Sequence, residues 1–305
     1  AGAGPAHPER GDGGVNILFT GASGFVGGAF MRRFADRAGL TLYGIGRRAD
    51  PGLPAGVRYR AIDLGQPFDL DFRPDAVIHA AGRASPWGRA EDYRRANVES
   101  TRQVIDFCRR RGWPRLVLVS STAVHYRLAH QYDLDEDSPA GPDFLNHYAA
   151  SKHAAEALLR DYPGEAVVVR PRAVFGAGDS VLFPRLLAAA RRGRLARVLA
   201  DGRPALGDLI HVDSLCDYLM AAATHPAPRD TYILTNGEPV VLADFLDRAL
   251  DALALPRPTR TLGAGTALRL AHVLELSHRL LRRPGEPAVT RFGVAVFAYS
   301  KTFDV

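Results

Sequence analysis

The chain has 305 residues, of which 47% are hydrophobic, so it can bury a large core in one large or two fused domains. Its charged fraction of 24% is ordinary for a globular protein. The net charge is +6, but the basic residues are spread along the chain without a basic arm or an aromatic-interleaved basic run, which favours an Arg-rich solvated surface over nucleic-acid binding.

Cysteine usage and hydrophobic runs bear on the compartment. Cys108 and Cys216 lie far apart and form neither a disulfide framework nor a zinc spacing, which indicates a reducing compartment. We find no signal-peptide pattern and no apolar run approaching about 18 residues, so we expect a soluble, cytoplasmic protein. The histidines lack metal-ligand spacing, so we expect no metal site; they include His79, His125, His130, His147, His153 and His211.

The first half of the chain alternates between predicted strands and helices. Residues 1–14 are small, polar and rich in Gly and Pro, so we expect a flexible tail without fold content. Residues 15–20 (VNILFT) predict a buried strand, and residues 24–39 have the apolar spacing of a helix. Further strands are predicted over 40–46, 57–64, 74–82, 115–121 and 166–171, and further helices over about 91–111 and 144–161. This alternation indicates a parallel sheet covered by helices on both faces.

Residues 20–27 (TGASGFVG) place Gly21, Gly24 and Gly27 directly after a predicted strand and at the start of a predicted helix. Glycine lets the backbone turn tightly and approach a pyrophosphate, while the helix N-terminus offers free N–H groups and positive dipole. A tight turn that needs glycine only for packing is the less favoured alternative in this context. No Gly-Lys-Ser/Thr follows, so the loop predicts a dinucleotide site and not a Walker-type site.

The end of the second predicted strand bears on the choice of cofactor. Gly46, Arg47 and Arg48 occupy this end, and no carboxylate comes before Asp50. A carboxylate there typically binds the ribose hydroxyls of NAD, whereas Arg accommodates the 2′-phosphate of NADP. We therefore predict NADP, with NAD as the alternative, although Arg is common throughout this chain.

The second half differs in having more proline and shorter strands, at 208–212 and 231–237. Its predicted helices cover 182–192, 213–223, 242–253 and 267–282. We interpret it as a smaller lobe over the carboxyl edge of the sheet. The fold class is therefore α/β, with a Rossmann-type doubly wound parallel sheet and a smaller C-terminal substrate lobe. The predicted organisation is a tail at 1–14, a dinucleotide-binding Rossmann domain at 15–175, and a mainly substrate-binding lobe at 176–305, with segments around 208–235 returning to the core.

Residues 148–152 (YAASK) lie within a predicted helix and place Tyr148 and Lys152 four residues apart. Residues i and i+4 share a helix face, so both side chains would point into one cleft. A nearby ammonium lowers the pKa of a phenol from its ordinary value of about 10. Lys152 and Lys301 are the only lysines among 39 Lys and Arg residues, which indicates that a compact ammonium is needed here. The alternative is an ordinary helix with a surface lysine.

Together, these motifs resemble the extended short-chain dehydrogenase/reductase family. The resemblance runs from Val15 over nearly the whole chain and keeps the family's order. The matching stretches are TGASGFVG (20–27), DL (63–64), HAAG (79–82), Asn97, VSSTAV (119–124), YAASK (148–152) and RPRAVFG (170–176). It implies that Tyr148 donates the proton in reduction and that Lys152 tunes Tyr148 and binds the nicotinamide ribose.

The resemblance implies a third catalytic group, a hydroxyl four residues before the Tyr of a Val-Tyr pair. His125 stands at that Tyr position here, which selects Ser121, whereas counting back from Tyr126 selects Thr122. We favour Ser121 and keep Thr122 as the alternative.

The resemblance also implies the residues that contact the cofactor. Asp63 would contact the adenine, with Leu64 over the ring, although a turn residue at a strand end is the alternative for Asp63. Asn97 would support the active-site helix. The expected cofactor-binding residues are Gly21, Ser23, Gly24, Phe25, Val26, Gly27, Arg47, Arg48, Asp63, Leu64, Ala80, Ala81, Gly82, Tyr148, Lys152, Pro171, Ala173 and Val174.

Three stretches favour the 3β-hydroxysteroid dehydrogenase-like branch over the nucleotide-sugar epimerases and dehydratases. RPRAVFG (170–176) has Pro171 and lacks the Asn of the sugar branch, and Gly207 stands where that branch often has Arg. The segment 286–305 is similar to one that continues in the hydroxysteroid branch, so we expect the natural chain to extend past Val305. We expect a secondary alcohol or ketone on a large apolar substrate, either sterol-like or a long-chain β-keto or β-hydroxy acid. A nucleotide-sugar enzyme and a catalytically silent cofactor binder are the alternatives.

The predicted helix at 267–283 has an apolar stripe with arginines mostly off it. The stripe consists of Leu270, Val273, Leu274, Ser277, Leu280 and Leu281. Packing onto the substrate lobe is favoured over peripheral membrane contact.

Among partners, we expect a small-molecule substrate, no nucleic acid, and a homodimer of the kind common in families that this chain resembles.

Overall fold

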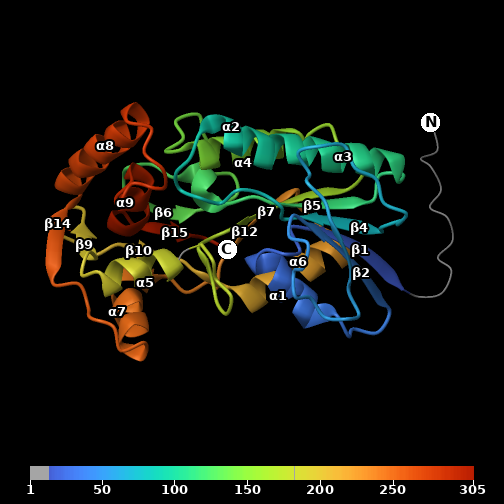
Figure 1. Cartoon of the computed structure of the whole chain (residues 1–305), viewed down its shortest axis with the longest axis horizontal. Coiled ribbons are helices and arrows are strands. Elements are labelled where there is room, and N and C mark those ends of the chain that lie inside the picture. The colour runs from blue at the N-terminus through green and yellow to red at the C-terminus, as the bar shows by residue number, and fades with distance from the viewer. Residues whose placement is uncertain (1–13, 182) are drawn as a thin grey trace.

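The computed structural model describes residues 14–181 and 183–305, and the predicted tail at 1–14 falls outside them except for Gly14. The molecule is elongated, with a helix-covered sheet at one end and a mainly helical lobe at the other (Figure 1). The predicted α/β class with a doubly wound parallel sheet is confirmed. Among the described helices, none is long and apolar enough to cross a membrane.

The main sheet has seven parallel strands in the order β12-β7-β5-β4-β1-β2-β3. The inner strand β1 pairs with β2 and β4, with Ile17 opposite both Leu42 and Ala76. The chain runs outward from β1 first in one direction and then in the other, so a crevice opens at the carboxyl ends of β1 and β4. The strands are β1 (Val15–Thr20), β2 (Leu40–Gly46), β3 (Arg58–Ala61), β4 (Ala76–His79), β5 (Arg115–Val119), β7 (Ala166–Pro171) and β12 (Thr231–Leu234).

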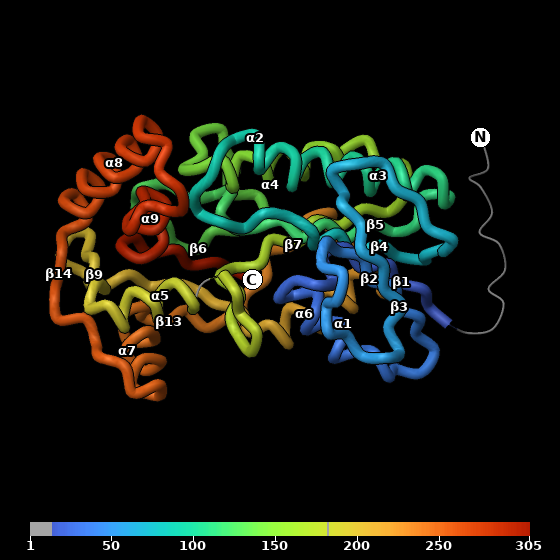
Figure 2. Tube along the Cα trace, viewed as in Figure 1, coloured from blue at the N-terminus to red at the C-terminus, as the bar shows by residue number. Residues whose placement is uncertain are grey.

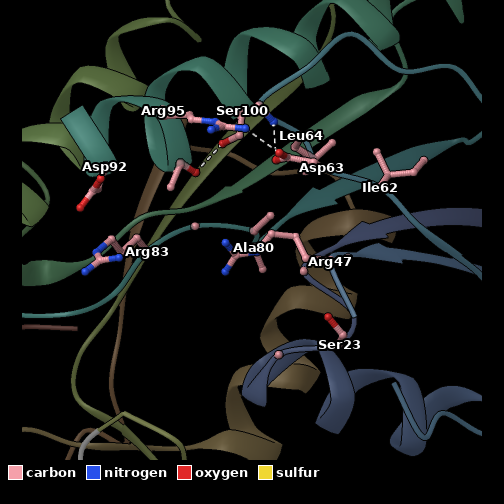
Figure 3. Close-up of a pocket in the computed structure, with 17 residues that line it drawn as sticks. Ser23, Arg47, Ile62, Asp63, Leu64, Ala80, Arg83, Asp92, Arg95 and Ser100 are labelled. Atoms are coloured by element: carbon pink, nitrogen blue, oxygen red, sulfur yellow. Dashed lines mark hydrogen bonds and ion pairs between the residues drawn. The ribbon is translucent and has the colours of Figure 1, made fainter. Parts of the chain in front are cut away.

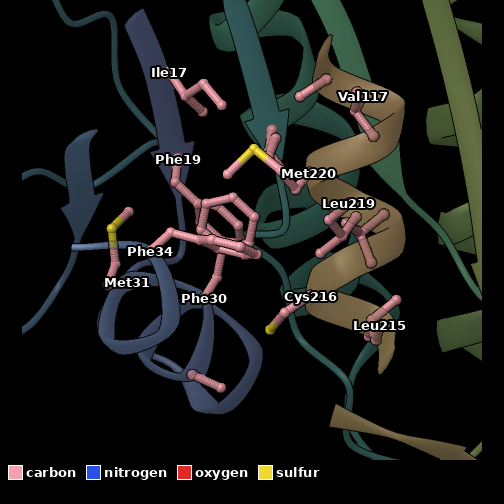
Figure 4. Packing of buried hydrophobic residues seen from close by; sticks show 14 of the residues in the cluster. Ile17, Phe19, Phe30, Met31, Phe34, Val117, Leu215, Cys216, Leu219 and Met220 are labelled. Carbon is pink, nitrogen blue, oxygen red and sulfur yellow. The ribbon is translucent and has the colours of Figure 1, made fainter. Parts of the chain in front are cut away.

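Helices cover both faces of this sheet. On one face, α1 (Phe25–Phe34) and α6 (Val212–Thr224) pack Phe30 and Leu219 against Phe19 of β1 (Figure 4). On the other face lie α3 (Ser100–Arg110) and α4 (His147–Ala157), with Phe107 in the core. Burial of each large apolar side chain contributes about 1.5–3 kcal/mol, so these two clusters hold the layers together. A short helix α2 (Ala90–Tyr93) and a π-helical turn (Arg94–Glu99) lead into α3.

The second lobe contains four further helices and several short strands. A four-stranded sheet in the order β13-β10-β15-β6 joins it to the main body. Figure 2 shows the red C-terminal segment running back from α9 beside β6. The elements are β6 (Gln131–Leu134), β8 (Val174–Phe175), α5 (Phe183–Arg191), β9 (Ala196–Leu199), β10 (Leu206–Gly207), β11 (Ile210–His211), β13 (Val240–Val241), α7 (Leu242–Ala252), β14 (Arg260–Gly263), α8 (Ala264–Leu280), α9 (Arg291–Ala298) and β15 (Lys301–Phe303).

Several predicted elements differ from the observed ones for local reasons. The helix predicted over 144–161 begins at His147, because the Asn146 side chain caps it by accepting from the Ala149 N–H. Of the strand predicted over 208–212, only β11 (Ile210–His211) is observed, and Asp208 lies in the short connection between β10 and β11. The packing predicted for the 267–283 stripe is found only in part: α8 buries Ala264, Ala267 and Ala271, Leu274 and Ser277 are half-buried, and most of the large side chains are exposed. The exposed ones are Leu270, Val273, Leu276, Leu280 and, just beyond α8, Leu281.

Candidate active site and cofactor cleft

The glycine loop joins β1 to α1 in a turn that only glycine accommodates. Gly21 has φ +80°, and a Cβ there would lie 2.8 Å from the Ala81 nitrogen. A Cβ on Gly27 would clash with the Gly21 carbonyl. Gly24 is the N-cap of α1, and the first turn of α1 carries no acidic residue. The N-terminus of α1 therefore presents free N–H groups and uncompensated positive dipole, which suits a pyrophosphate.

A cleft of about 470 Å³ opens above this loop, at the carboxyl ends of the strands. Half of the residues expected to bind the cofactor line it: Gly21, Ser23, Gly24, Arg47, Asp63, Leu64, Ala80, Ala81 and Gly82. The other half do not line it: Phe25, Val26, Gly27, Arg48, Tyr148, Lys152, Pro171, Ala173 and Val174. Gly27 supports the loop from below, whereas Tyr148, Lys152 and Pro171 lie around the adjoining active centre.

Sequence reasoning missed several cleft residues because no motif marks them. Arg83, Asp92, Arg95 and Ser100 line the cleft from the segment between β4 and α3. Arg95 forms an ion pair of 2.6 Å with Asp63, whose other oxygen accepts from the Gly65 N–H (Figure 3). Both carboxylate oxygens of Asp63, the residue expected to contact the adenine, therefore have partners within the chain. Arg95 adds a cation to the end of the cleft where the adenine is expected.

The end of β2 lies against Ser23, so position 46 has no space for a side chain. A Cβ on Gly46 would clash with the Ser23 hydroxyl. Arg47 follows directly, is exposed and lines the cleft, with Ser23 below it and Asp63 above it in Figure 3. Arg48 is also exposed but does not line the cleft. A cation therefore occupies the strand end where a carboxylate would bind ribose hydroxyls.

Lys152 lies on the buried face of α4 and points toward the cofactor cleft. Its ammonium donates to the Val119 carbonyl at 2.8 Å and lies 3.3 Å from where a Cβ on Gly82 would be. Burial lowers the pKa of Lys152 to about 8, while the Glu156 carboxylate acts in the opposite direction. One hydrogen bond is fixed, so two ammonium protons remain to donate to a ligand in the cleft.

Tyr148 lies one turn before Lys152, next to Ser121. Burial raises the pKa of Tyr148 to about 12, and a hydrogen bond with the Ser121 side chain opposes this shift. The Thr122 hydroxyl faces elsewhere, 3.1 Å from the Tyr126 hydroxyl and 3.5 Å from the Pro171 carbonyl. Of the two expected hydroxyls, the structure thus brings Ser121 and not Thr122 to the phenol.

Asn97 joins the π-helical turn to the helix that carries Tyr148. Its Oδ1 accepts from the Arg83 N–H at 2.7 Å, and its Nδ2 donates to the Ser151 hydroxyl at 2.7 Å. A π-helical turn rotates side chains relative to an α-helix and often occurs at functional sites. Here it points Asn97 inward, where its hydrogen bonds connect Arg83, which lines the cofactor cleft, to Ser151 on α4.

A buried polar network lies beneath the active centre. Arg170 donates from Nε (3.1 Å) and Nη2 (2.8 Å) to the two oxygens of Glu156, and Ser120 donates to the same carboxylate. His125 Nε2 lies 3.1 Å from Arg170 Nη1, and burial lowers the pKa of His125 to about 4, so the ring is neutral and accepts. Across residues 14–181 and 183–305, no group of His, Cys, Asp and Glu could hold a metal ion.

Comparison with known proteins places the chain among dinucleotide-dependent enzymes. Residues 17–235 match the model of the NAD dependent epimerase/dehydratase family. A 2-alkyl-3-oxoalkanoate reductase of Stenotrophomonas maltophilia is 35% identical over 292 residues, which cover 91% of this chain and 88% of that protein. A 3beta-hydroxysteroid-dehydrogenase/decarboxylase of Arabidopsis thaliana is 28% identical over 245 residues, 75% of this chain and 56% of that protein.

Solved structures share the fold. The Bordetella bronchiseptica enzyme WbmH in complex with NAD+ superimposes with a TM-score of 0.70 at 19% identity, over 82% of this chain and 86% of that one. MoeE5 in complex with UDP-glucuronic acid and NAD gives a TM-score of 0.64 at 25% identity, over 81% of this chain and 85% of that one.

Proposed function

The chain belongs to the NAD dependent epimerase/dehydratase family, in its extended short-chain dehydrogenase/reductase branch, and from this premise we propose a specific reaction. The protein is an NAD(P)-dependent oxidoreductase that interconverts a secondary alcohol and a ketone on a large apolar substrate. The observation that carries this proposal is the position of Ser121, Tyr148 and Lys152 beside a dinucleotide-sized cleft at the carboxyl edge of the sheet. A protein that only bound a cofactor would not need the buried phenol.

The residues have distinct roles in reduction. The cleft residues and Lys152 would hold a nicotinamide cofactor, which would supply the hydride for the carbonyl carbon. Ser121 holds the carbonyl oxygen, and Tyr148 donates the proton to it. Burial raises the pKa of Tyr148 to about 12, in contrast to the lowering expected from Lys152, so the phenol is protonated at neutral pH. Lys152 holds the cofactor ribose through its free ammonium protons. Thr122 keeps Tyr126 in place and does not touch the reacting atoms.

We favour NADP over NAD as the cofactor. Arg47 supplies a guanidinium to the cleft, and Gly46 leaves no room for the carboxylate that would select NAD. The solved relatives WbmH and MoeE5 hold NAD, so the preference rests on these residues of this chain.

The surroundings of Tyr148 favour an apolar substrate. Tyr148 packs in one cluster with Ala149, Phe144, Phe292 and Phe303. The substrate is sterol-like or a long-chain β-keto or β-hydroxy acid, in keeping with the names of the reductase and the hydroxysteroid dehydrogenase above.

We also propose that residues 15–175 form the cofactor-binding unit. Residues 176–305 would form mainly the substrate-binding unit; the word mainly is needed because β12, which belongs to this range, pairs with β7 in the main sheet. The active unit would be a cytoplasmic homodimer.

The test is consumption of NADPH, and separately of NADH, with a panel of 3-ketosteroids and long-chain β-keto acids. We expect turnover with at least one ketone, and a loss of kcat of about 10³-fold or more in Tyr148→Phe, because this variant keeps the ring and removes the proton. Turnover that survives in Tyr148→Phe would contradict the mechanism. Tight cofactor binding without consumption for any ketone would favour a nucleotide-sugar epimerase or dehydratase, in which the cofactor is recycled.

A further inference from the structure

Arg172, at the end of β7, is a buried cation without a partner for two of its nitrogens. Its residue is 2% exposed, and within the described chain neither Nε nor Nη2 makes a hydrogen bond. These two nitrogens share one edge of the guanidinium and can together hold a carboxylate. Arg170, two residues earlier, uses the same edge to hold both oxygens of Glu156. A buried guanidinium with this edge unused is costly unless something occupies it in a functional state.

The charges around Arg172 do not balance. Lys301 is fully buried and donates to the carbonyls of Ala129 (2.6 Å) and Ser300 (3.3 Å). Asp208 is the carboxylate that interacts electrostatically with Arg172, but they form no ion pair in the described chain, and Asp208 Oδ1 lacks a partner there. Burial lowers the pKa of Lys301 to about 7, and the charge of Arg172 acts in the same direction. At neutral pH, Arg172 and the protonated fraction of Lys301 thus face one carboxylate, and an added anion would compensate for the excess positive charge.

This cationic cluster adjoins the proposed catalytic residues through Tyr126. The Arg172 guanidinium carbon lies 5.2 Å, and Lys301 Nζ 5.9 Å, from the centre of the Tyr126 ring. The Tyr126 hydroxyl bonds Thr122, the neighbour of Ser121. Tyr126 also belongs to the apolar cluster that contains Tyr148. Arg172 therefore lies behind the Tyr126 ring, within the same buried region that holds Ser121 and Tyr148.

A glycine beside Arg172 keeps space at the unused edge. A Cβ on Gly207 would lie 3.3 Å from Arg172 Nη2 and 3.1 Å from a methyl of Leu242. Any side chain at this position would press on the guanidinium from β10. The absence of a side chain at position 207 thus removes one group that would press on Nη2.

We propose that Arg172 binds the carboxylate of the substrate through Nε and Nη2, and so selects a β-hydroxy or β-keto acid over a neutral sterol-like alcohol. This inference rests on the proposed oxidoreductase function. In a 3-oxo acid, two bonds separate the carbonyl carbon from the carboxyl carbon. A carboxylate on Arg172 therefore determines which carbonyl along an apolar chain reaches Ser121 and Tyr148. Arg172 is then a specificity-determining residue that touches the substrate.

The test measures oxidation of a long-chain 3-hydroxy acid and of its methyl ester by the full chain with NADP+ and with NAD+. The hydroxy compounds are used because 3-oxo acids lose CO2 in solution. We expect the wild-type protein to prefer the acid by about 100-fold in kcat/KM, because a desolvated guanidinium–carboxylate pair is lost with the ester. In Arg172→Met, kcat/KM for the acid should fall by about 100-fold, mainly through KM, and for the ester by about threefold or less.

Two further variants separate recognition from folding. Arg172→Met should keep or raise the unfolding temperature, because it removes a buried charge without a bidentate partner, whereas Arg170→Met should lower it. Gly207→Ala, which presses on Nη2, should reduce oxidation of the acid more than that of the ester. Equal losses for both substrates in Arg172→Met, or an unchanged rate with the acid, would overturn the inference. A wild-type protein that oxidises acid and ester equally well would overturn it too, while leaving the proposed function intact. Oxidation of neither would instead contradict the proposed function.

Discussion

At the scale of single residues, the chain reserves lysine for two buried positions. Lys152 is 6% exposed and Lys301 is fully buried, and each donates to backbone carbonyls that a compact ammonium can reach. A planar guanidinium has its donors in a fixed fork and could not satisfy the same carbonyls. The sequence indicated a special role for Lys152, because it follows Tyr148 by one turn. No pattern in the sequence predicted that Lys301 lies beside Tyr126, because that contact depends on the pairing of β15 within the four-stranded sheet.

Lys152 makes cofactor binding depend on pH. Because burial lowers its pKa to about 8, the ammonium loses its proton, and with it a donor for the ribose, as the pH rises through that value. We expect the Kd of NADPH, measured by fluorescence from about pH 6 to about pH 10, to rise by up to about tenfold per unit above the inflection. Lys152→Met should remove this inflection. Lys301 titrates nearby, with a pKa of about 7, so Lys301→Met is the control and should keep it.

Arg47 and Arg48 form a matched pair for testing cofactor choice. Both are exposed, but only Arg47 lines the cleft. We expect Arg47→Gln to raise KM for NADPH by about 10- to 100-fold, because it removes a guanidinium from the 2′-phosphate, and to leave KM for NADH nearly unchanged. Arg48→Gln should change neither. Equal effects of Arg47→Gln on both cofactors would show that Arg47 does not distinguish them.

At the scale of elements, the network around Glu156 ties three secondary-structure elements together. Arg170 comes from the end of β7, Ser120 follows β5, and Glu156 belongs to α4, one turn after Lys152. These contacts determine where α4 lies against the sheet, and therefore where Tyr148 and Ser121 meet. The sequence did not predict this network, because its members are separated along the chain and each looks like an ordinary polar residue.

The pair of Arg170 and Glu156 should matter more for stability than surface ion pairs do. Arg170→Met leaves a buried carboxylate without its main partner, so we expect the free energy of unfolding to fall by about 3–5 kcal/mol. The measurement is urea-induced unfolding followed by circular dichroism. The double variant Arg170→Met with Glu156→Met should recover most of the loss, because it removes both charges. If the double variant is less stable than Arg170→Met, the pair does not act as a buried charge pair.

The helix α8 shows where a hydrophobic pattern misleads. Its leucines and valine predicted a packed stripe, but the buried residues of α8 are alanines, with Leu268 packing beside them. Small side chains allow close approach of α8 to its neighbours, so the larger residues are left outside, with Leu280 73% exposed. Periodicity alone identifies the helix, whereas the face that is buried depends on the shape of the surface it meets.

At the scale of the whole molecule, the sequence predicted the main sheet and the helices α5, α6, α7 and α8 well, but not the short strands of the second lobe. Most inner strands of the main sheet are apolar runs, since both faces are covered by helices, and such runs can be recognised without tertiary information. The lobe is built from strands of two to four residues whose partners are distant, such as Gly207 with Lys301. Strands this short carry no periodic signal, so β15 was not predicted, and the short helix α9 was not predicted either.

The position of β15 has a consequence for biosynthesis. Residues 301–303 lie between β10 and β6, pairing with Gly207 on one side and with Gln131 on the other. During translation, the seven strands of the main sheet leave the ribosome before residues 301–303 do, and folding domains generally assemble in the order of synthesis. The cofactor half can therefore fold early, while the substrate half stays open until this strand emerges. A nascent chain would gain a nucleotide-binding surface well before it could discriminate among substrates.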